Sequence, residues 1–398
     1  MLASIRTRFS HTIRACYLGY VTQAIVNCFA PLLFLTFMSE FDLTMERITL
    51  ITTVNFAVQL VVDALSVKVV DRIGYRPCIV AAHFFAALGL AGLAFFPRLM
   101  SPLAGILISV ACYAIGGGLI EVLVSPIVEA CPTDAKASAM TLLHSFYSWG
   151  YVFLVAVSTA FFALFGMEHW RILACIWALI PLTNLFYFLL VPIYPIVAEG
   201  TRQLPLKELL SQRVFWLLLV MMICAGASEQ AMAQWASTFA EKGLNVSKSL
   251  GDLAGPCTFA ALMGTARTLY GKFSERIPLK AFMLGSSVLG IVCYLLAALS
   301  GNALLALAGC GLCGFSVGIF WPGTFAIAPT VLPGGGTAMY ALMALFGDLG
   351  CSCGPTLVGL VSGAAGGDLR TGLLAGLIFP VLMLLMTLML RPVSRKSS

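Results

Sequence analysis

The sequence predicts an all-α membrane protein with twelve transmembrane helices, arranged as two pseudo-symmetric bundles of six. Three observations predict this fold class. The 398 residues are 60% hydrophobic and only 10% charged, whereas a soluble domain carries about 25% charged residues. Apolar runs of about 20 residues, long enough to cross a hydrocarbon core of about 30 Å, recur between short polar breaks. Features of the first half also return in the second half at a steady offset.

The apolar runs define the twelve predicted spans, which with their loops fill nearly the whole chain. In order they cover residues 12–38, 48–69, 77–96, 102–130, 137–165, 170–192, 215–240, 249–273, 280–299, 303–331, 337–364 and 371–390. Several are longer than a simple crossing needs, so we expect tilted helices. The longest polar break divides the chain into an N-terminal bundle (1–192), a cytoplasmic linker (193–213) and a C-terminal bundle (214–398).

The basic residues predict the orientation of these spans. With the N-terminus inside, sixteen lysines and arginines fall in inner loops or at inner helix ends, and six fall on the outer side. Cytoplasmic loops carry such an excess. We therefore expect a multi-pass protein of the inner (cytoplasmic) membrane, embedded in lipid, with both termini cytoplasmic and residues 1–14 as a cytoplasmic tail. The loops also explain the net charge of +6, so nucleic acid is not an expected partner.

An internal repeat relates the two halves. Asp71-Arg72 follows the second span, and Glu275-Arg276 follows the eighth span 204 residues later. Gly118 and Gly318 begin similar segments at an offset of 200 residues. A steady offset near half the chain length indicates duplication of a six-helix unit. Two such units around a midplane site are the architecture of alternating access.

The loop after the second span resembles a family signature. It reads Asp71-Arg72-Ile-Gly74-Tyr-Arg76, which is similar to the motif of the major facilitator superfamily: a glycine, three residues, then Asp-Arg-x-Gly-x-Arg. Val67 stands at the place of the leading glycine. The resemblance implies the major facilitator fold. It also implies a gating latch at the inner surface, formed by Asp71, Arg72, Arg76, Glu275 and Arg276.

The fourth span carries a second resemblance. Glu121 is followed by Ser125-Pro126, similar to the fucose/glucose/galactose–proton symporter branch, where a membrane glutamate is followed four and five residues later by Asn-Pro. Serine replaces the asparagine here. Some members of that branch have an acid in the first span, where this chain offers only Gln23 and Asn27. The resemblance implies sugar transport coupled to protons.

Glu121 is the predicted proton carrier. It lies about ten residues into the fourth span, which at about 1.5 Å per residue is near the middle of the membrane. Ionisable groups at this depth are candidates for function. The alternative is a permanently protonated glutamate that only bonds a neighbouring helix. Gly116, Gly117 and Gly118 precede it and favour close helix approach.

Polar and aromatic residues in several spans form the predicted solute site. Amides beside a tryptophan suit a polar solute with hydroxyl groups and an apolar face. The Trp321-Pro322-Gly323 segment breaks the tenth span at the repeat equivalent of Glu121. The candidates are Gln23, Asn27, Glu121, His144, Trp149, Glu229, Gln230, Gln234, Trp235 and Trp321. The competing interpretations are a polar lining that only hydrates a cavity, packing tryptophans and a structural histidine.

Three further charges lie inside the spans. Asp63 and Arg267 each stand eight residues before the acid of their motif copy, and Asp348 lies at a depth close to that of Arg267. A buried arginine needs a counter-ion. We therefore predict an Arg267–Asp348 pair with a gating or structural role. The alternative is that Arg267 binds an anionic substrate.

These features together predict a transporter without enzymatic activity. No phosphate-binding or nucleophile motif, metal-ligand pattern or cofactor motif is present, so neither a metal nor a cofactor is expected. The leading hypothesis is a monomeric, proton-coupled symporter of a small polar solute, plausibly a sugar or another hydroxylated metabolite. The alternatives are a proton-driven exporter of amphipathic compounds and a membrane sensor that kept the fold without transport.

Overall fold

The structure is a computed structural model that describes residues 2–133, 136–194, 206–273, 277–332 and 336–390. The first half contains α1 (Leu2–Thr7), α2 (Phe9–Cys28), η1 (Ala30–Leu33), α3 (Phe34–Phe41), α4 (Met45–Ile73), α5 (Tyr75–Leu99), α6 (Pro102–Ala130), α7 (Lys136–Phe165), η2 (Met167–His169) and α8 (Trp170–Leu190). The second half contains α9 (Leu206–Ser211), α10 (Arg213–Ala233), α11 (Ala236–Thr238), η3 (Phe239–Gly243), α12 (Lys248–Asp252), η4 (Leu253–Cys257), α13 (Thr258–Phe273), α14 (Leu279–Leu299), α15 (Ala303–Val317), α16 (Phe320–Val331), α17 (Gly336–Ala364), α18 (Leu369–Gly376) and α19 (Ile378–Met389). The described residues form no strand, and the predicted all-α class is confirmed.

Within the described residues, eleven helical stretches are long and apolar enough to cross a membrane, judged by length and composition. They correspond to eleven of the twelve predicted spans. The predicted eighth span, 249–273, is helical as α12, η4 and α13 but is not among the eleven. It contains a π-helical turn around Pro256 and carries Asp252 and Arg267, which make it less apolar than the others.

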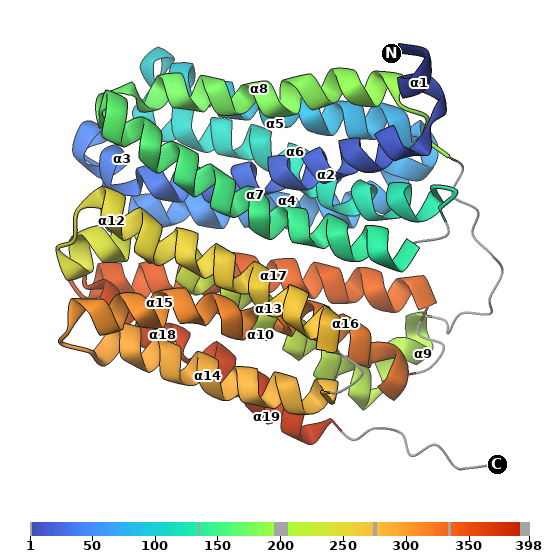
Figure 1. Ribbon diagram of the computed structural model, residues 1–398. Coiled ribbons are helices and arrows are strands. Elements are labelled where there is room, and N and C mark those ends of the chain that lie inside the picture. Colours follow the sequence, from blue (N-terminus) through green and yellow to red (C-terminus); the bar gives the residue numbers. More distant parts are fainter. Residues whose placement is uncertain (1, 134–135, 195–205, 274–276, 333–335, 391–398) are drawn as a thin grey trace.

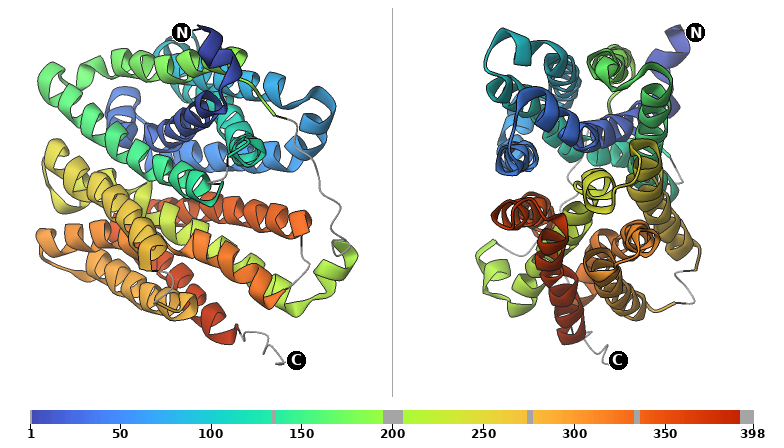
Figure 2. Two further views of the ribbon diagram at one scale, coloured as in Figure 1. Left: turned by 45° about the vertical axis from the view of Figure 1, so that its right-hand side comes forward. Right: turned by 90° about the vertical axis from the view of Figure 1, so that its left-hand side faces the viewer.

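The helices of the two halves lie in two groups. Figure 1 shows α1–α8 above and α10–α19 below, with α1 and the end of α19 at the same end of the molecule. We call this the near end, and the opposite end, where α3 and α12 lie, the far end. The view from the far end in Figure 2 shows the same division, with blue-to-green helices above yellow-to-red ones.

Helices α4 and α17 form an antiparallel seam between the groups. The Thr53 and Thr356 hydroxyls are 2.5 Å apart and share a hydrogen bond. Further towards the far end, a Cβ added at Gly359 would lie 2.1 Å from the Thr49 hydroxyl. Small residues at a helix interface let two membrane helices approach closely. The glycine therefore sets the spacing between α4 and α17.

Several spans are broken, and the breaks in the first, seventh and tenth spans lie near the residues of the candidate site. The first span changes from α2 to η1 at Pro31, which has no N–H to donate to the Asn27 carbonyl four residues earlier. The seventh is interrupted between α10 and α11, and the tenth between α15 and α16. Broken helices in a membrane require partners for the freed carbonyls. Side chains supply these partners, as described below.

Candidate functional site

Buried amide side chains from α2 and α4 form a hydrogen-bonded cluster around Glu121 of α6. Gln23 Nε2 donates to Gln59 Oε1 at 2.9 Å and to Glu121 Oε2 at 3.0 Å. Gln59 Nε2 donates in turn to Asn27 Oδ1 at 2.8 Å, and Asn55 Nδ2 donates to the same oxygen at 3.2 Å. The four amide residues are buried, with at most 6% exposure. We call these five residues the amide cluster.

The glycines before Glu121 allow this cluster to form. A Cβ at Gly116 would lie 2.4 Å from the Ala82 carbonyl of α5. A Cβ at Gly117 would lie 3.1 Å from Gln23 Oε1, and one at Gly118 would lie 3.0 Å from Asp63 Oδ1. The predicted close approach of neighbouring helices at this glycine run is confirmed.

The amide cluster continues into the second half of the chain. Gln234 Nε2 donates to the Asn27 carbonyl, freed by Pro31, at 2.9 Å and to Gln230 Oε1 at 2.9 Å. Gln230 Nε2 donates to Glu229 Oε1 at 3.3 Å. A continuous chain of hydrogen bonds therefore joins Glu121 in one bundle to Glu229 in the other.

Arg267 of α13 ends this chain. Its Nη2 lies 3.4 Å from Glu229 Oε2, and both side chains are mostly buried, with 16% and 11% exposure. Nη1 donates to the Ser148 hydroxyl of α7 at 3.2 Å. Nε donates to the Gly318 carbonyl at 3.2 Å. That carbonyl lacks its helical donor because Pro322 stands four residues later.

The predicted Arg267–Asp348 ion pair is wrong in this structure. Arg267 pairs with Glu229 instead. The prediction compared depths along the helices only, and two residues at one depth can still face different neighbours. The break in the tenth span is confirmed, but it lies at Gly318–Ile319 rather than at Trp321, because α16 begins at Phe320 and places Pro322 in its first turn.

Asp348 faces Asp63 across the seam between α17 and α4. The two carboxyl groups lie close enough to interact directly, and two carboxylates this close repel each other when both are charged. Asp348 is buried, with 5% exposure. The pair joins the two bundles closer to the near end than the Thr53–Thr356 contact does.

The predicted tryptophans have different surroundings. Trp235 is fully buried, donates from Nε1 to the Pro355 carbonyl at 3.0 Å and packs against Phe34. Its ring therefore anchors the seventh span and is not free to pack on a solute, contrary to the prediction. Trp321 stacks on Phe325 and lies over Gly347, next to Asp348.

His144 and Trp149 lie on α7, outside the amide cluster. Both are exposed, and the Trp149 side chain is 49% exposed. The ring of His144 lies 5.3 Å from that of Tyr20, whose hydroxyl is 3.5 Å from the Ser125 hydroxyl. Ser125 follows Glu121 by one helical turn, so His144 is placed near the serine that replaces the expected asparagine.

The predicted latch residues lie at the near end. Arg76 donates to the carbonyls of Phe188, Leu189 and Val191 at 2.8 to 3.0 Å, and so caps the last turn of α8. Arg72 is exposed. The Asp71 side chain, Glu275 and Arg276 lie outside what the structure describes.

Several site residues were missed by the sequence analysis. Asn55 and Gln59 follow each other by one helical turn, and Asp63 by another, so they share one face of α4. That spacing could have identified Asn55 and Gln59 from the sequence. Nothing in the sequence around Ser148 indicates its contact with Arg267. Lys248 and Asp252, counted only as loop charge or not at all, form a buried cluster at the far end. In the described residues no group of histidine, cysteine and acidic side chains could hold a metal ion.

Comparison with known proteins identifies the family. The sequence profile of the Major Facilitator Superfamily matches residues 17–355. The chain belongs to the major facilitator superfamily. It is therefore a membrane transporter with a multi-pass helical fold, and not an enzyme. The resemblance inferred from the Asp71–Arg76 motif is confirmed.

Solved structures of superfamily transporters share the fold at low sequence identity. A bacterial homologue of the human lysosomal transporter Spinster, in an inward-facing and occupied conformation, is 16% identical with a TM-score of 0.74, covering 95% of this chain and 96% of that chain. The nucleoside transporter NupG is 14% identical with a TM-score of 0.75, covering 95% and 99%. The E. coli fucose:proton symporter FucP is 16% identical with a TM-score of 0.64, covering 95% and 98%. No curated protein sequence matches the chain.

Proposed function

We propose that this superfamily transporter is a proton-coupled symporter of a small polar solute, such as a sugar or another hydroxylated metabolite. The amide cluster carries the proposal. Its amides donate and accept hydrogen bonds without bearing charge, which suits a neutral solute with several hydroxyl groups. An exporter of amphipathic compounds would need a larger apolar lining.

Two buried oxygens in the cluster support this solute class. Gln23 Oε1 and Asn55 Oδ1 have no hydrogen-bond partner among the described residues. A buried acceptor without a donor costs about 1–3 kcal/mol. Hydroxyl groups of a solute would supply the donors. FucP and NupG, described as a fucose:proton symporter and a nucleoside transporter, also handle solutes rich in hydroxyl groups.

Glu121 is the proposed proton carrier. Its carboxylate accepts from Gln23, so the amide that bonds Glu121 also belongs to the proposed solute site. A change of protonation at Glu121 would therefore change the donors and acceptors that the solute meets. The remaining proposed solute contacts are Asn27, Gln230, Gln234, Glu229, Trp321, His144 and Trp149.

The proposed gates lie at two contacts between the bundles and at the near end. Asp63 and Asp348 join α4 to α17, and Arg267 joins α13 to α7 through Ser148. Asp71, Arg72, Arg76, Glu275 and Arg276 form the proposed latch at the near end. We place the near end in the cytoplasm, with the linker 193–213 and both termini.

Glu121→Gln tests the proton role. The variant mimics a permanently protonated carboxyl, so solute binding and solute exchange across a liposome membrane should persist. Uphill accumulation driven by a proton gradient should be lost, because no proton is carried with the solute. Solutes for this assay come from a thermal-shift screen of the purified protein with sugars, nucleosides and amphipathic compounds.

Glu168→Gln is the matched control, because Glu168 is 74% exposed at the far end. It should accumulate solute like the wild-type protein. Accumulation by Glu121→Gln at the wild-type level would show that Glu121 is only a structural hydrogen-bonding residue. Stabilisation by amphipathic compounds alone would contradict the proposed solute class.

A further inference from the structure

An ammonium group occupies an oxygen-lined cluster at the far end. Lys248, at the start of α12, places its Nζ 2.8 Å from the Leu32 carbonyl, 3.1 Å from Asp252 Oδ2 and 3.2 Å from Glu241 Oε1. An ammonium has three N–H donors. All three therefore have an oxygen partner, and the lysine side chain is only 17% exposed.

The partners of Lys248 come from both bundles. Leu32 belongs to η1, the segment in which Pro31 interrupts the first span. Asp252 and Glu241 belong to the second half. Asp252 is fully buried and also accepts from the Ser237 hydroxyl and, at 3.5 Å, from the Thr159 hydroxyl of α7. The cluster therefore bridges the halves through Leu32 and Thr159.

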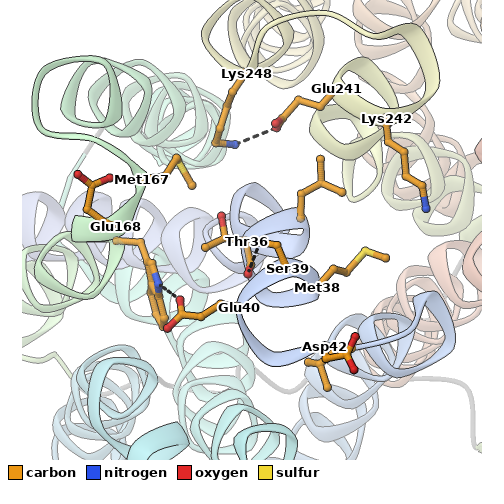
Figure 3. Close-up of a pocket in the computed structure, with 13 residues that line it drawn as sticks. Thr36, Met38, Ser39, Glu40, Asp42, Met167, Glu168, Glu241, Lys242 and Lys248 are labelled. Carbon is orange, nitrogen blue, oxygen red and sulfur yellow. Dashed lines mark hydrogen bonds and ion pairs between the residues drawn. The ribbon is translucent and has the colours of Figure 1, made fainter.

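The cluster lies at the edge of a cavity of about 890 Å³ between the far ends of the halves. Figure 3 shows Lys248 reaching Glu241 on one wall, with Thr36, Met38 and Ser39 of the first half opposite. Lys242 lines the same cavity, and its amine points away from Glu241. Separation of the far ends must break the bond between Lys248 and Leu32, while Lys248 can keep both carboxylates.

One backbone carbonyl near a helix break and two carboxylates surround the Lys248 ammonium, and transporters coordinate sodium ions with backbone carbonyls at broken helices. We propose that Lys248 is a built-in cation in such a site, and that its ammonium latches the far ends of the two bundles together. Without the lysine, the two carboxylates would leave the site with two uncompensated negative charges, which a sodium ion or a small alkylammonium ion can neutralise. This inference rests on the symport proposed above, in which the two bundles move relative to each other.

Hydrogen–deuterium exchange of the purified protein tests the latch without any solute or proton gradient. Lys248→Ala should speed exchange roughly tenfold in peptides covering 29–38 and 236–252, because it removes a charged hydrogen bond between the halves. Methylammonium chloride or sodium chloride should slow it again, compared with N-methylglucamine chloride at the same ionic strength. In the wild-type protein and in Lys242→Ala, exchange should remain slow and neither salt should change it.

Unchanged exchange in Lys248→Ala would overturn the latch. Faster exchange that neither cation reverses would overturn the cation site. Lys248→Met with Asp252→Asn removes one charge of each sign and serves if Lys248→Ala does not fold. In this double variant, both peptides should exchange faster than in the wild-type protein, and neither cation should slow the exchange. Exchange at the wild-type rate would overturn the proposal. These readouts do not involve Glu121, so they can fail while proton coupling stands.

Discussion

Arg267 makes three hydrogen bonds, and each has a longer donor–acceptor distance than a strong hydrogen bond between charged groups. Its contacts with Glu229, Ser148 and Gly318 range from 3.2 to 3.4 Å, whereas a strong pair of charged groups lies at about 2.7–2.9 Å. These contacts link α13 to α7, to α10 and to the break between α15 and α16.

The Arg267–Glu229 pair should be energetically coupled. Arg267→Ala leaves a mostly buried carboxylate without its cation, which costs about 3 kcal/mol in comparable cases. Glu229→Gln in the same chain should recover part of that loss. The free energy of unfolding of both single variants and the double variant, measured in detergent, gives the coupling energy.

Asp348→Asn provides the control for this cycle. Because Asp348 faces Asp63, its change should add independently to that of Arg267→Ala. Coupling of Arg267 to Asp348 instead of Glu229 would restore the pairing expected from the sequence and contradict the structure.

At the scale of elements, glycines decide which helices meet. Gly359 of α17 packs against Thr49 of α4, and the ring of Trp235 lies 2.7 Å from the position of an added Cβ. In contrast, a Cβ at Gly285 of α14 would have no neighbour within 4 Å. Both glycines lie inside α-helices, yet only Gly359 lies where two helices meet.

Gly359→Ala should therefore lower the melting temperature, because the methyl group forces α4 and α17 apart. Gly285→Ala should leave it unchanged or raise it, since alanine favours a helix interior over glycine by about 1 kcal/mol. Differential scanning fluorimetry of both variants makes the comparison. Equal effects at the two positions would mean that the α4–α17 seam does not depend on close packing at Gly359.

The sequence predicted the helical elements better than their contacts. Apolar length located eleven spans, and Pro322 indicated the break in the tenth span, because these signals are local; the break at Pro31 was not predicted. The Glu229–Arg267 and Asp63–Asp348 partnerships were not predictable, because they depend on how helices rotate about their axes in the packed bundle. Lys248 was interpreted as an exposed loop residue for a related reason. The sequence around a lysine near a helix end is the same whether its side chain lies in water or is buried against the other half.

At the scale of the whole molecule, α1 and the end of α19 lie at the near end, and so do the ends of α4, α5 and α14 that carry Arg72, Arg76 and Lys280. This agreement supports a single orientation in the membrane. The far end carries the Lys248 cluster and its cavity, which would then face the outside of the cell. The bonds of Gln234 and Lys248 join the second half to the first half on that side.

Reporter fusions test this orientation. Green fluorescent protein inserted at residue 203 or fused to the C-terminus should fluoresce, and alkaline phosphatase at the same positions should be inactive, because both sites are expected in the cytoplasm. Phosphatase inserted after Asn245, in the loop before α12, should be active. Active phosphatase at residue 203 would reverse the orientation and place the Lys248 cavity inside the cell.

Pro31 has a consequence for how the protein is made. Its missing N–H leaves the Asn27 carbonyl dependent on Gln234, which is synthesised about two hundred residues later. The first helix therefore enters the membrane before its permanent partner exists, and domains made on the ribosome generally start folding from the N-terminus. Until the seventh span arrives, that carbonyl lacks the Gln234 donor. The hydrogen bond to this backbone carbonyl of the first bundle therefore forms only when the second bundle assembles.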